Sequence, residues 1–287
     1  MTENQRGSLF MVASMAGFAV EDMFIKSASR AMPVGQVLVL MGALGVLWFG
    51  ALARRAGQPA FPAALRSRTM ALRSGFELVG RLFYALALAL TPLSVTSAIL
   101  QATPLVVVAG AALLFGERVG AGRWALTALG FAGVLVILRP GLQGFDVLSL
   151  LAVVGLLGFA GRDLATRAAP PALSNAQLGV AGFAVLAVSG LVILGFQGGF
   201  QGGPILPPAL PLAKALGAAG FGILGYSYLT RAMRTGEVSA VTPFRYTRLL
   251  FALILGVLVF GERPDLATLI GSAMVVTCGI LILGQRR

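Results

Sequence analysis

The sequence predicts an all-α integral membrane protein with ten transmembrane helices, arranged as two inverted five-helix repeats. Three observations support this fold class: an apolar composition, ten long apolar runs and an internal repeat. Of the 287 residues, 57% are hydrophobic and 11% are charged, and the mean hydropathy is +0.90. An average soluble protein carries about 25% charged residues, so this chain has too little charge to cover a soluble surface. The composition therefore excludes an ordinary soluble enzyme.

The apolar runs have the length of membrane helices, because one crossing needs about 20 mostly apolar residues. They are rich in Leu, Ala and Gly and lack the strict alternation of a membrane strand, which disfavours a β-barrel. No clear small-residue cleavage site follows the first run, so we expect a retained helix rather than a signal peptide. Turn-forming Gly and Pro residues separate the later runs. The ten predicted helices cover residues 8–27, 35–53, 70–90, 94–115, 122–138, 147–168, 175–196, 210–232, 238–260 and 266–284.

The second half of the chain is similar to the first. A shift of 145 residues places LLFGER (113–118) on LVFGER (258–263), and Gly80 on Gly225. A shift of 141 residues places GFAVEDMFIK, which starts at Gly17, on GFAGRDLATR, which starts at Gly158. The predicted domains are therefore a first five-helix repeat at 1–141 and a second at 142–287.

An odd number of helices per repeat dictates how the repeats are related. The second copy enters the membrane from the opposite side, so the two copies are predicted to be antiparallel about an axis in the membrane plane. Many secondary transporters have this arrangement, bind their substrate between the repeats near the midplane, and alternate access by rocking. The alternative is that duplication is only an economical way to build a large membrane protein.

The chain carries 22 Lys and Arg against 10 Asp and Glu, a formal charge of +12. The basic residues cluster between apolar runs, which indicates membrane topology rather than a nucleic-acid partner. Because cytoplasmic loops are enriched in Lys and Arg, we expect a multi-pass membrane protein with both termini in the cytoplasm. Thirteen cations are assigned to the cytoplasmic side, at positions 6, 54, 55, 66, 68, 73, 118, 123, 167, 231, 234, 286 and 287, against at most five on the other.

The composition also limits the chemistry. The chain has no histidine, and its one cysteine, Cys278, lies in an apolar run. We therefore expect no metal, no cofactor and no catalytic residues, and a membrane enzyme is disfavoured. The chain has no P-loop motif that would bind ATP. The expected partners are a small-molecule substrate and the lipid bilayer; the oligomeric state stays open, with a monomer as one alternative.

The paired FGER segments, the Thr-Pro sequences in the fourth and ninth predicted helices and the five-plus-five layout resemble the drug/metabolite transporter superfamily. The similarity is to its EamA-type members, and most to the YddG-type exporters of aromatic amino acids. This resemblance implies a secondary transporter of the bacterial inner membrane that exports aromatic and other neutral amino acids, with broad specificity, by alternating access. The alternatives are a carrier of phosphorylated or nucleotide-linked metabolites, or a passive pore.

Ionisable residues inside a membrane are costly and are candidates for function. Four acids and four bases are predicted inside the membrane, which suggests mutual neutralisation. They are Glu21, Asp22, Glu77 and Asp163, and Arg81, Arg162, Arg245 and Arg248. Glu77 and Arg81 stand one turn apart as a favourable pair, and Arg245 is a candidate for a substrate carboxylate. The alternative is that Arg245 and Arg248 pair with Glu77 and Asp163. The candidate substrate-binding residues, aromatic wall residues included, are Phe18, Glu77, Arg81, Tyr84, Ser97, Gln101, Phe159, Tyr226, Tyr228, Arg245, Tyr246 and Arg248.

A second set is predicted to act in gating or coupling. Asp22 and Asp163 occupy the same slot in the two repeats, so we expect them toward opposite sides of the membrane, each with a nearby cation. Proline frees a helical carbonyl and lets a helix bend. The FGER segments are expected to fix the short turns that follow them. The gating set is Asp22, Lys26, Asp163, Arg167, Pro104 and Pro243.

Overall fold

The computed structural model describes residues 1–90, 99–139, 147–196, 209–260 and 264–284. All regular structure in these ranges is helical, which confirms the all-α prediction. The elements are α1 (Glu3–Ala28), α2 (Val34–Arg55), η1 (Ala63–Arg66), α3 (Arg68–Leu90), α5 (Thr103–Phe115), α6 (Ala121–Leu138), α7 (Ser149–Arg167), α8 (Asn175–Phe196), α9 (Ala209–Arg234), α10 (Val238–Val241), η4 (Thr242–Tyr246), α11 (Thr247–Phe260) and α12 (Leu266–Gly284).

Within the described ranges, seven segments are long and apolar enough to cross a membrane: α1, α2, α6, α7, α8, α9 and Val238–Leu255, which joins α10, η4 and part of α11. Two shorter apolar helices lie at Thr103–Phe115 and Leu266–Ile282. Helix α3 is not among them, and it carries three ionisable side chains, Arg73, Glu77 and Arg81, within nine residues. The chain is therefore a multi-pass membrane protein, and the count of ten crossings stays a prediction.

Helix α1 begins five residues before the predicted start, because a polar cap stabilises its first turn. The backbone N–H of Gln5 donates to Oγ1 of Thr2 at 3.2 Å, and the Gln5 side chain accepts from the N–H of Thr2 at 2.9 Å. This reciprocal pair satisfies backbone donors that a helix start leaves without partners. A search for apolar runs alone misses such a polar first turn.

The two Thr-Pro sequences interrupt helices that the sequence predicts as continuous. Residues 101–102 form a turn before α5 begins at Thr103, and residues 94–98 lie outside the described ranges. The predicted helix 238–260 is divided at Thr242–Tyr246 into α10, η4 and α11. Proline has no N–H and collides with the preceding turn, so both breaks follow from Pro104 and Pro243.

The main helix pairs pack antiparallel through glycines. A methyl group on Gly17 of α1 would lie 3.0 Å from the backbone nitrogen of Gly225 of α9. A methyl group on Gly158 of α7 would lie 2.5 Å from the nitrogen of Gly80 of α3. Gly17 and Gly158 are repeat equivalents, as are Gly225 and Gly80, so the same close contact occurs once in each half. Small residues allow membrane helices this approach.

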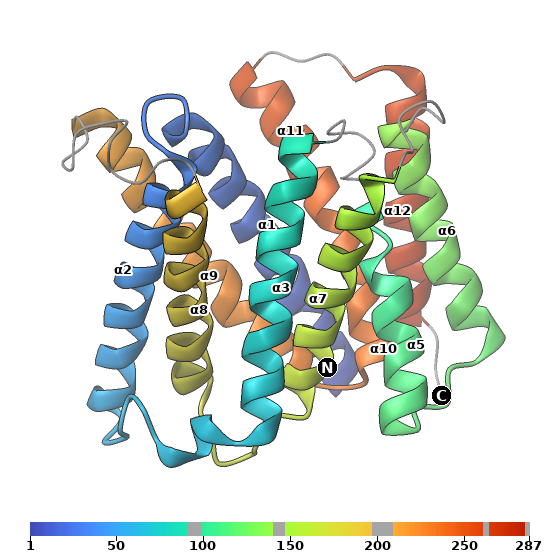
Figure 1. The fold of residues 1–287 in the computed structure, drawn as a ribbon. Coiled ribbons are helices and arrows are strands. Elements are labelled where there is room, and N and C mark those ends of the chain that lie inside the picture. The colour runs from blue at the N-terminus through green and yellow to red at the C-terminus, as the bar shows by residue number, and fades with distance from the viewer. Residues whose placement is uncertain (91–98, 140–146, 197–208, 261–263, 285–287) are drawn as a thin grey trace.

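The first residues of α1 and the last residues of α12 lie at the same end of the bundle (Figure 1). We name this the terminal end, and the opposite one the far end. At the terminal end the N–H of Glu237 donates to Oδ1 of Asn4 at 2.9 Å. Helices α3 and α10–α11 run from the terminal end to the far end, and α7 and α9 run back.

Candidate functional site

Three charged side chains follow one face of α3 at intervals of four residues. Oε1 of Glu77 lies 3.0 Å from Nη2 of Arg81, which is the predicted pair, and its Oε2 lies 3.4 Å from Nη1 of Arg73. The carboxylate of Glu77 is fully buried, so its charge depends on these arginines. Arg73 was assigned to a cytoplasmic loop by the sequence, and this is wrong: its side chain is buried between helices.

Helix α7 adds a second acid and a further arginine. Nη1 of Arg162 lies 3.7 Å from Oε1 of Glu77, and Nη2 of Arg162 lies 2.8 Å from Oδ1 of Asp163. Nη1 of Arg245, in η4, donates to Oδ2 of Asp163. Charges from α3, α7 and the interrupted helix therefore form one network. We name it the central charge cluster; its members are Arg73, Glu77, Arg81, Arg162, Asp163 and Arg245.

Arg73 connects this cluster to the packing at the terminal half of the bundle. Its Nε donates to Oγ1 of Thr166 at 3.0 Å, and its Nη2 donates to the hydroxyl of Tyr226. The Tyr226 ring packs against Phe49 and Phe183, with ring centroids 6.3 and 5.4 Å away. All three rings are buried, so Arg73 is anchored in a packed aromatic core.

A second ion pair joins α1 to α11. Nε of Arg248 donates to Oδ2 of Asp22 at 2.9 Å, and Nη2 of Arg248 donates to Oδ1 at 2.6 Å. This fork is the strong two-point geometry of arginine and carboxylate. The guanidinium also lies 5.5 Å from the ring centroid of Phe18. Arg248 therefore pairs with Asp22, and not with Glu77 or Asp163, whereas Arg245 does pair with Asp163.

Solvent exposure of these side chains rises from the terminal half toward the far end. The exposed fractions are 1% for Arg73, 0% for Glu77, 8% for Arg162, 13% for Arg245, 23% for Arg81, 35% for Arg248 and 51% for Asp22. Arg81 lies two turns beyond Arg73, about 12 Å along the helix. Lipid cannot solvate a half-exposed charge, so we infer that water reaches Asp22 and Arg248. It does not reach Glu77.

The remaining aromatic residues of the predicted site lie in different parts of the bundle. Tyr84 contacts Phe159 edge to face at 6.0 Å, and the Arg162 guanidinium lies 5.3 Å from the Phe159 ring centroid, so both lie beside the central charge cluster. Tyr228 instead contacts Phe10 at 6.0 Å, nearer the terminal end. The hydroxyl of buried Tyr246 donates to a backbone carbonyl of α6 at 3.3 Å.

The remaining predicted residues take no part in these contacts or lie outside the described ranges. Gln101 is half-buried in the turn before α5, and Ser97 lies outside the described residues. Neither Lys26 nor Arg167 forms an ion pair within the described part of the chain. The predicted gate cations therefore do not pair with Asp22 or Asp163; Arg248, Arg162 and Arg245 do.

The first FGER segment has a different contact from the one predicted. The carboxylate of Glu117 accepts from the N–H groups of Val238 at 2.9 Å and Ser239 at 3.0 Å. Beside it, Nη1 of Arg123 lies 2.8 Å from Oε2 of Glu237. Helix starts have N–H groups without intrahelical partners, so Glu117 caps α10 from the other half of the chain. Glu262 and Arg263 of the second segment lie outside the described residues.

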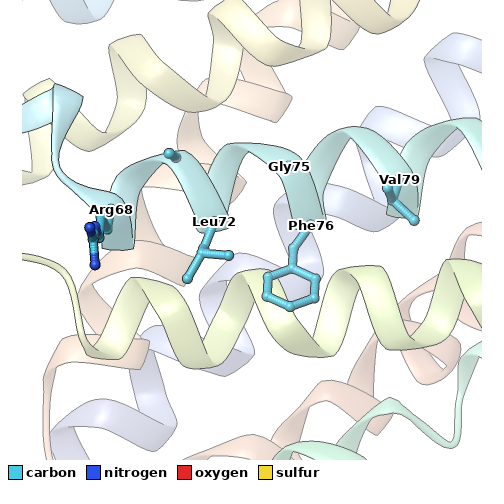
Figure 2. A pocket seen from close by; sticks show the side chains of 6 residues that line it. Arg68, Leu72, Gly75, Phe76 and Val79 are labelled. Atoms are coloured by element: carbon cyan, nitrogen blue, oxygen red, sulfur yellow. The ribbon is translucent and has the colours of Figure 1, made fainter.

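A shallow groove lies along the outer face of α3 (Figure 2). Its lining is mostly apolar, and Leu72, Phe76 and Val79 are exposed. An exposed apolar face of a membrane helix is expected to contact lipid, so this groove is not a candidate site. The lining residues are Arg68, Ala71, Leu72, Gly75, Phe76 and Val79. Among the described residues, no group of three His, Cys, Asp or Glu side chains is placed to hold a metal ion.

Comparison with known proteins gives a family match over both halves of the chain. The sequence profile described as the EamA-like transporter family matches residues 5–139 and again residues 145–284. A crystal structure with 22% sequence identity superposes with a TM-score of 0.79, covering 98% of this chain and 99% of the other. At this identity the superposition shows a shared fold alone.

Curated relatives are similar over much of the chain. The pseudopaline exporter of Pseudomonas aeruginosa is 28% identical over 282 residues, which cover 96% of this chain and 95% of the relative. A riboflavin transporter of Rhizobium johnstonii is 30% identical over 199 residues, 68% of this chain and 63% of the relative. An S-adenosylmethionine uptake transporter of Rickettsia prowazekii is 24% identical over 214 residues, covering 74% and 70%.

Proposed function

Because the chain belongs to the EamA-like transporter family, we propose that it is a secondary carrier that moves a small metabolite across the bacterial inner membrane by alternating access. The observation that carries this proposal is the gradient of exposure along the charged residues. Asp22 and Arg248 are 51% and 35% exposed, whereas Glu77 and Arg73 are almost fully buried. A carrier open to one side has this asymmetry, and a continuous pore does not.

The proposed architecture is a pair of inverted five-helix repeats, at 1–141 and 142–287, with ten crossings. Antiparallel packing of equivalent helices supports it. In α2 and α8, Gly35 lies against Gly190, and Phe49 lies against Gly179, so the start of one helix meets the end of the other. Two equivalent helices can run in opposite directions only when one unit is turned over relative to the other.

The proposed orientation places both termini in the cytoplasm. With Arg73 removed from the loop count, the terminal end still holds most of the cations, including Arg6, Arg54, Arg55, Arg231 and Arg234. Cytoplasmic loops show this enrichment. In this orientation the exposed pair faces outward and the sealed half faces the cytoplasm, which corresponds to an outward-open carrier.

The substrate of this chain is less closely defined than its family. The curated relatives are named for pseudopaline, riboflavin and S-adenosylmethionine, so the expectation of amino-acid export has no support from them. The relative that matches over nearly the whole chain is named as an exporter, which favours export as the direction of transport. Neutral amino acids, aromatic ones included, stay in the set to be tested.

The test is counterflow in liposomes containing the purified protein and loaded with one unlabelled solute at a time. The set is pseudopaline, riboflavin, S-adenosylmethionine, tryptophan, threonine and a sugar phosphate. We expect saturable uptake of at least one labelled solute, accelerated by the same solute inside. Asp22→Asn, which breaks the half-exposed pair with Arg248, should abolish it, and Asp265→Asn, a matched change in another exposed ion pair, should not. Flux that does not saturate, or ion conductance, would indicate a pore and overturn the proposal.

A further inference from the structure

The charges of the central charge cluster do not cancel. It contains four arginines and two carboxylates, a formal charge of +2. The sequence suggested neutrality because it counted Arg73 outside the membrane. One further acid, Glu21 of α1, interacts electrostatically with both Arg248 and Arg81. Even with Glu21 ionised, and with the Asp22–Arg248 pair included, five arginines face four acids.

A net positive charge in the middle of a membrane protein needs a counter-ion. Buried charges are expensive unless they are paired, and lipid offers no compensation. Arg81 and Arg248 are the most exposed arginines of this set, at 23% and 35%, so a dissolved anion would meet them first. An anion that binds there would neutralise the excess.

Both arginines have donors to spare. A guanidinium carries five N–H groups. Arg81 forms its hydrogen bond to Glu77 through Nη2, and its buried Nε has no partner among the described residues. Arg248 uses Nε and Nη2 on Asp22. The two arginines come from α3 and α11. Arg81 pairs with Glu77, and the cluster extends from there to Arg245, three residues before Arg248, so both arginines flank the same ion-pair network.

We infer that the transported solute binds as an organic anion with one carboxylate in excess of its cationic groups, held by Arg81 and Arg248. The planar fork of arginine matches a carboxylate at two points. An excess of one positive charge suits a solute of charge −1 better than a phosphate monoester near −2. The carboxylates of Glu21 and Asp22 would repel the second negative charge. This inference rests on the proposed carrier function, because it assigns the chemistry of the same site.

The test compares probes that share a skeleton and differ in charge. N-acetylphenylalanine carries one carboxylate, its amide is neutral, and phenylalanine amide is a cation; a glycine series and phenyl phosphate accompany them. Binding to the full-length protein in nanodiscs is measured through thermal unfolding. We expect the acids to bind roughly tenfold or more tightly than their amides, since charge-assisted hydrogen bonds are the stronger ones.

Variants then locate the binding site. Arg81→Gln and Arg248→Gln should each remove most of the preference for the acid, and Arg81→Lys should keep part of it. Arg139→Gln is the control, because Arg139 pairs with an acid on the exposed far-end surface, away from this region. If the glutamine variants fail to fold, the comparison of acids with their amides on the wild-type protein still tests the inference.

Several results would overturn the inference: equal binding of acids and amides, no binding of any acid, tighter binding of the amines or the phosphate, or an unchanged preference in Arg81→Gln. Counterflow separates this inference from the carrier proposal. Acid binding without counterflow would leave the charge assignment standing and refute the carrier. Saturable counterflow with no preference for anions would support the carrier and refute the charge assignment.

Discussion

Asp22 and Asp163 occupy the same position in the two repeats and have different surroundings. Asp163 is buried and contacts two arginines, Arg162 and Arg245. Asp22 is half exposed and contacts one, Arg248. The two partners Arg245 and Arg248 lie three residues apart on the same interrupted helix, so one element of the second half contacts both equivalent aspartates. The repeat therefore determines where the carboxylate lies in the helix, and the neighbouring helices determine whether that carboxylate is buried or exposed.

Under the proposed alternating access, a buried Asp163 and a half-exposed Asp22 are expected in a state that is open on one side only. If the halves exchange conformations during transport, the environment of Asp22 becomes closed when that of Asp163 opens. The break around Pro243 contains Arg245, and Arg248 follows in the first turn of α11. The break is a natural place for the change, because its 3-10 geometry lacks the regular hydrogen bonds of an α-helix.

The largest effect is expected at Glu77. The substitution Glu77→Gln removes the charge that three arginines share, Arg73, Arg81 and Arg162. Removing one partner of a buried charge pair costs about 3–5 kcal/mol, so we expect a large fall in thermal stability and poor yield of folded protein. The measurement is thermal unfolding in detergent. An unfolding temperature within a degree of wild type would show that the arginines are compensated in another way.

The comparison of the two aspartates is the second prediction. Asp163→Asn breaks buried contacts and should lower stability by an amount close to that of Glu77→Gln. Asp22→Asn breaks an exposed pair, worth about 0–1 kcal/mol, and should leave stability nearly unchanged. Measuring both variants by thermal unfolding isolates the effect of surroundings from that of position. Equal losses of stability in the two variants would show that burial of the aspartate does not determine how much its ion pair stabilises the fold.

The glycine contacts between helices give the third prediction. Gly158→Ala places a methyl group 2.5 Å from a backbone nitrogen of α3, which side-chain rotation cannot relieve. Overpacking of this kind costs about 1–3 kcal/mol. Gly75→Ala, where nothing lies within 4 Å of the added methyl group, is the control and should be neutral or slightly stabilising. Comparable unfolding temperatures for both variants would contradict the close α3–α7 packing.

The sequence predicted most of the helices because long apolar runs and turn residues are local features. It also predicted the pair Glu77–Arg81, since a spacing of four places two side chains on one helix face. Arg73 has the same spacing on the other side of Glu77, and that signal was available. The arginines just before it outweighed this spacing. Because cytoplasmic loops are enriched in Lys and Arg, Arg73 was counted with those loop residues.

Contacts between distant segments were beyond the sequence. Nothing local indicates that Arg248 selects Asp22, or that the carboxylate of Glu117 caps a helix 121 residues away. The interruption at Pro243 was anticipated as a bend, whereas the division into three segments depends on how η4 packs against α1, α5 and α6. Such choices among several possible partners are decided by tertiary packing.

The smallest effect is expected at the exposed pair Arg139–Asp265, which lies outside the membrane-spanning segments. The hydrogen bond from Arg139, followed by that from the N–H of Thr268, holds the pKa of Asp265 below its usual range. A carboxyl whose pKa is lower in the folded state stabilises the fold above its unfolded pKa, about 3.9, and loses that contribution as the pH falls further.

The stability that Asp265 provides should therefore be constant near neutral pH and decline only below about pH 4. The measurement is the unfolding temperature of wild type and Asp265→Asn between pH 3 and pH 8. Because both side chains of the pair are about half exposed, solvent screens it and the two curves should lie close together at neutral pH, converging as the acid is protonated. A separation that appears or grows between pH 5 and pH 8 would contradict this account and direct attention to an acid inside the bundle, where the sealed and open regions differ.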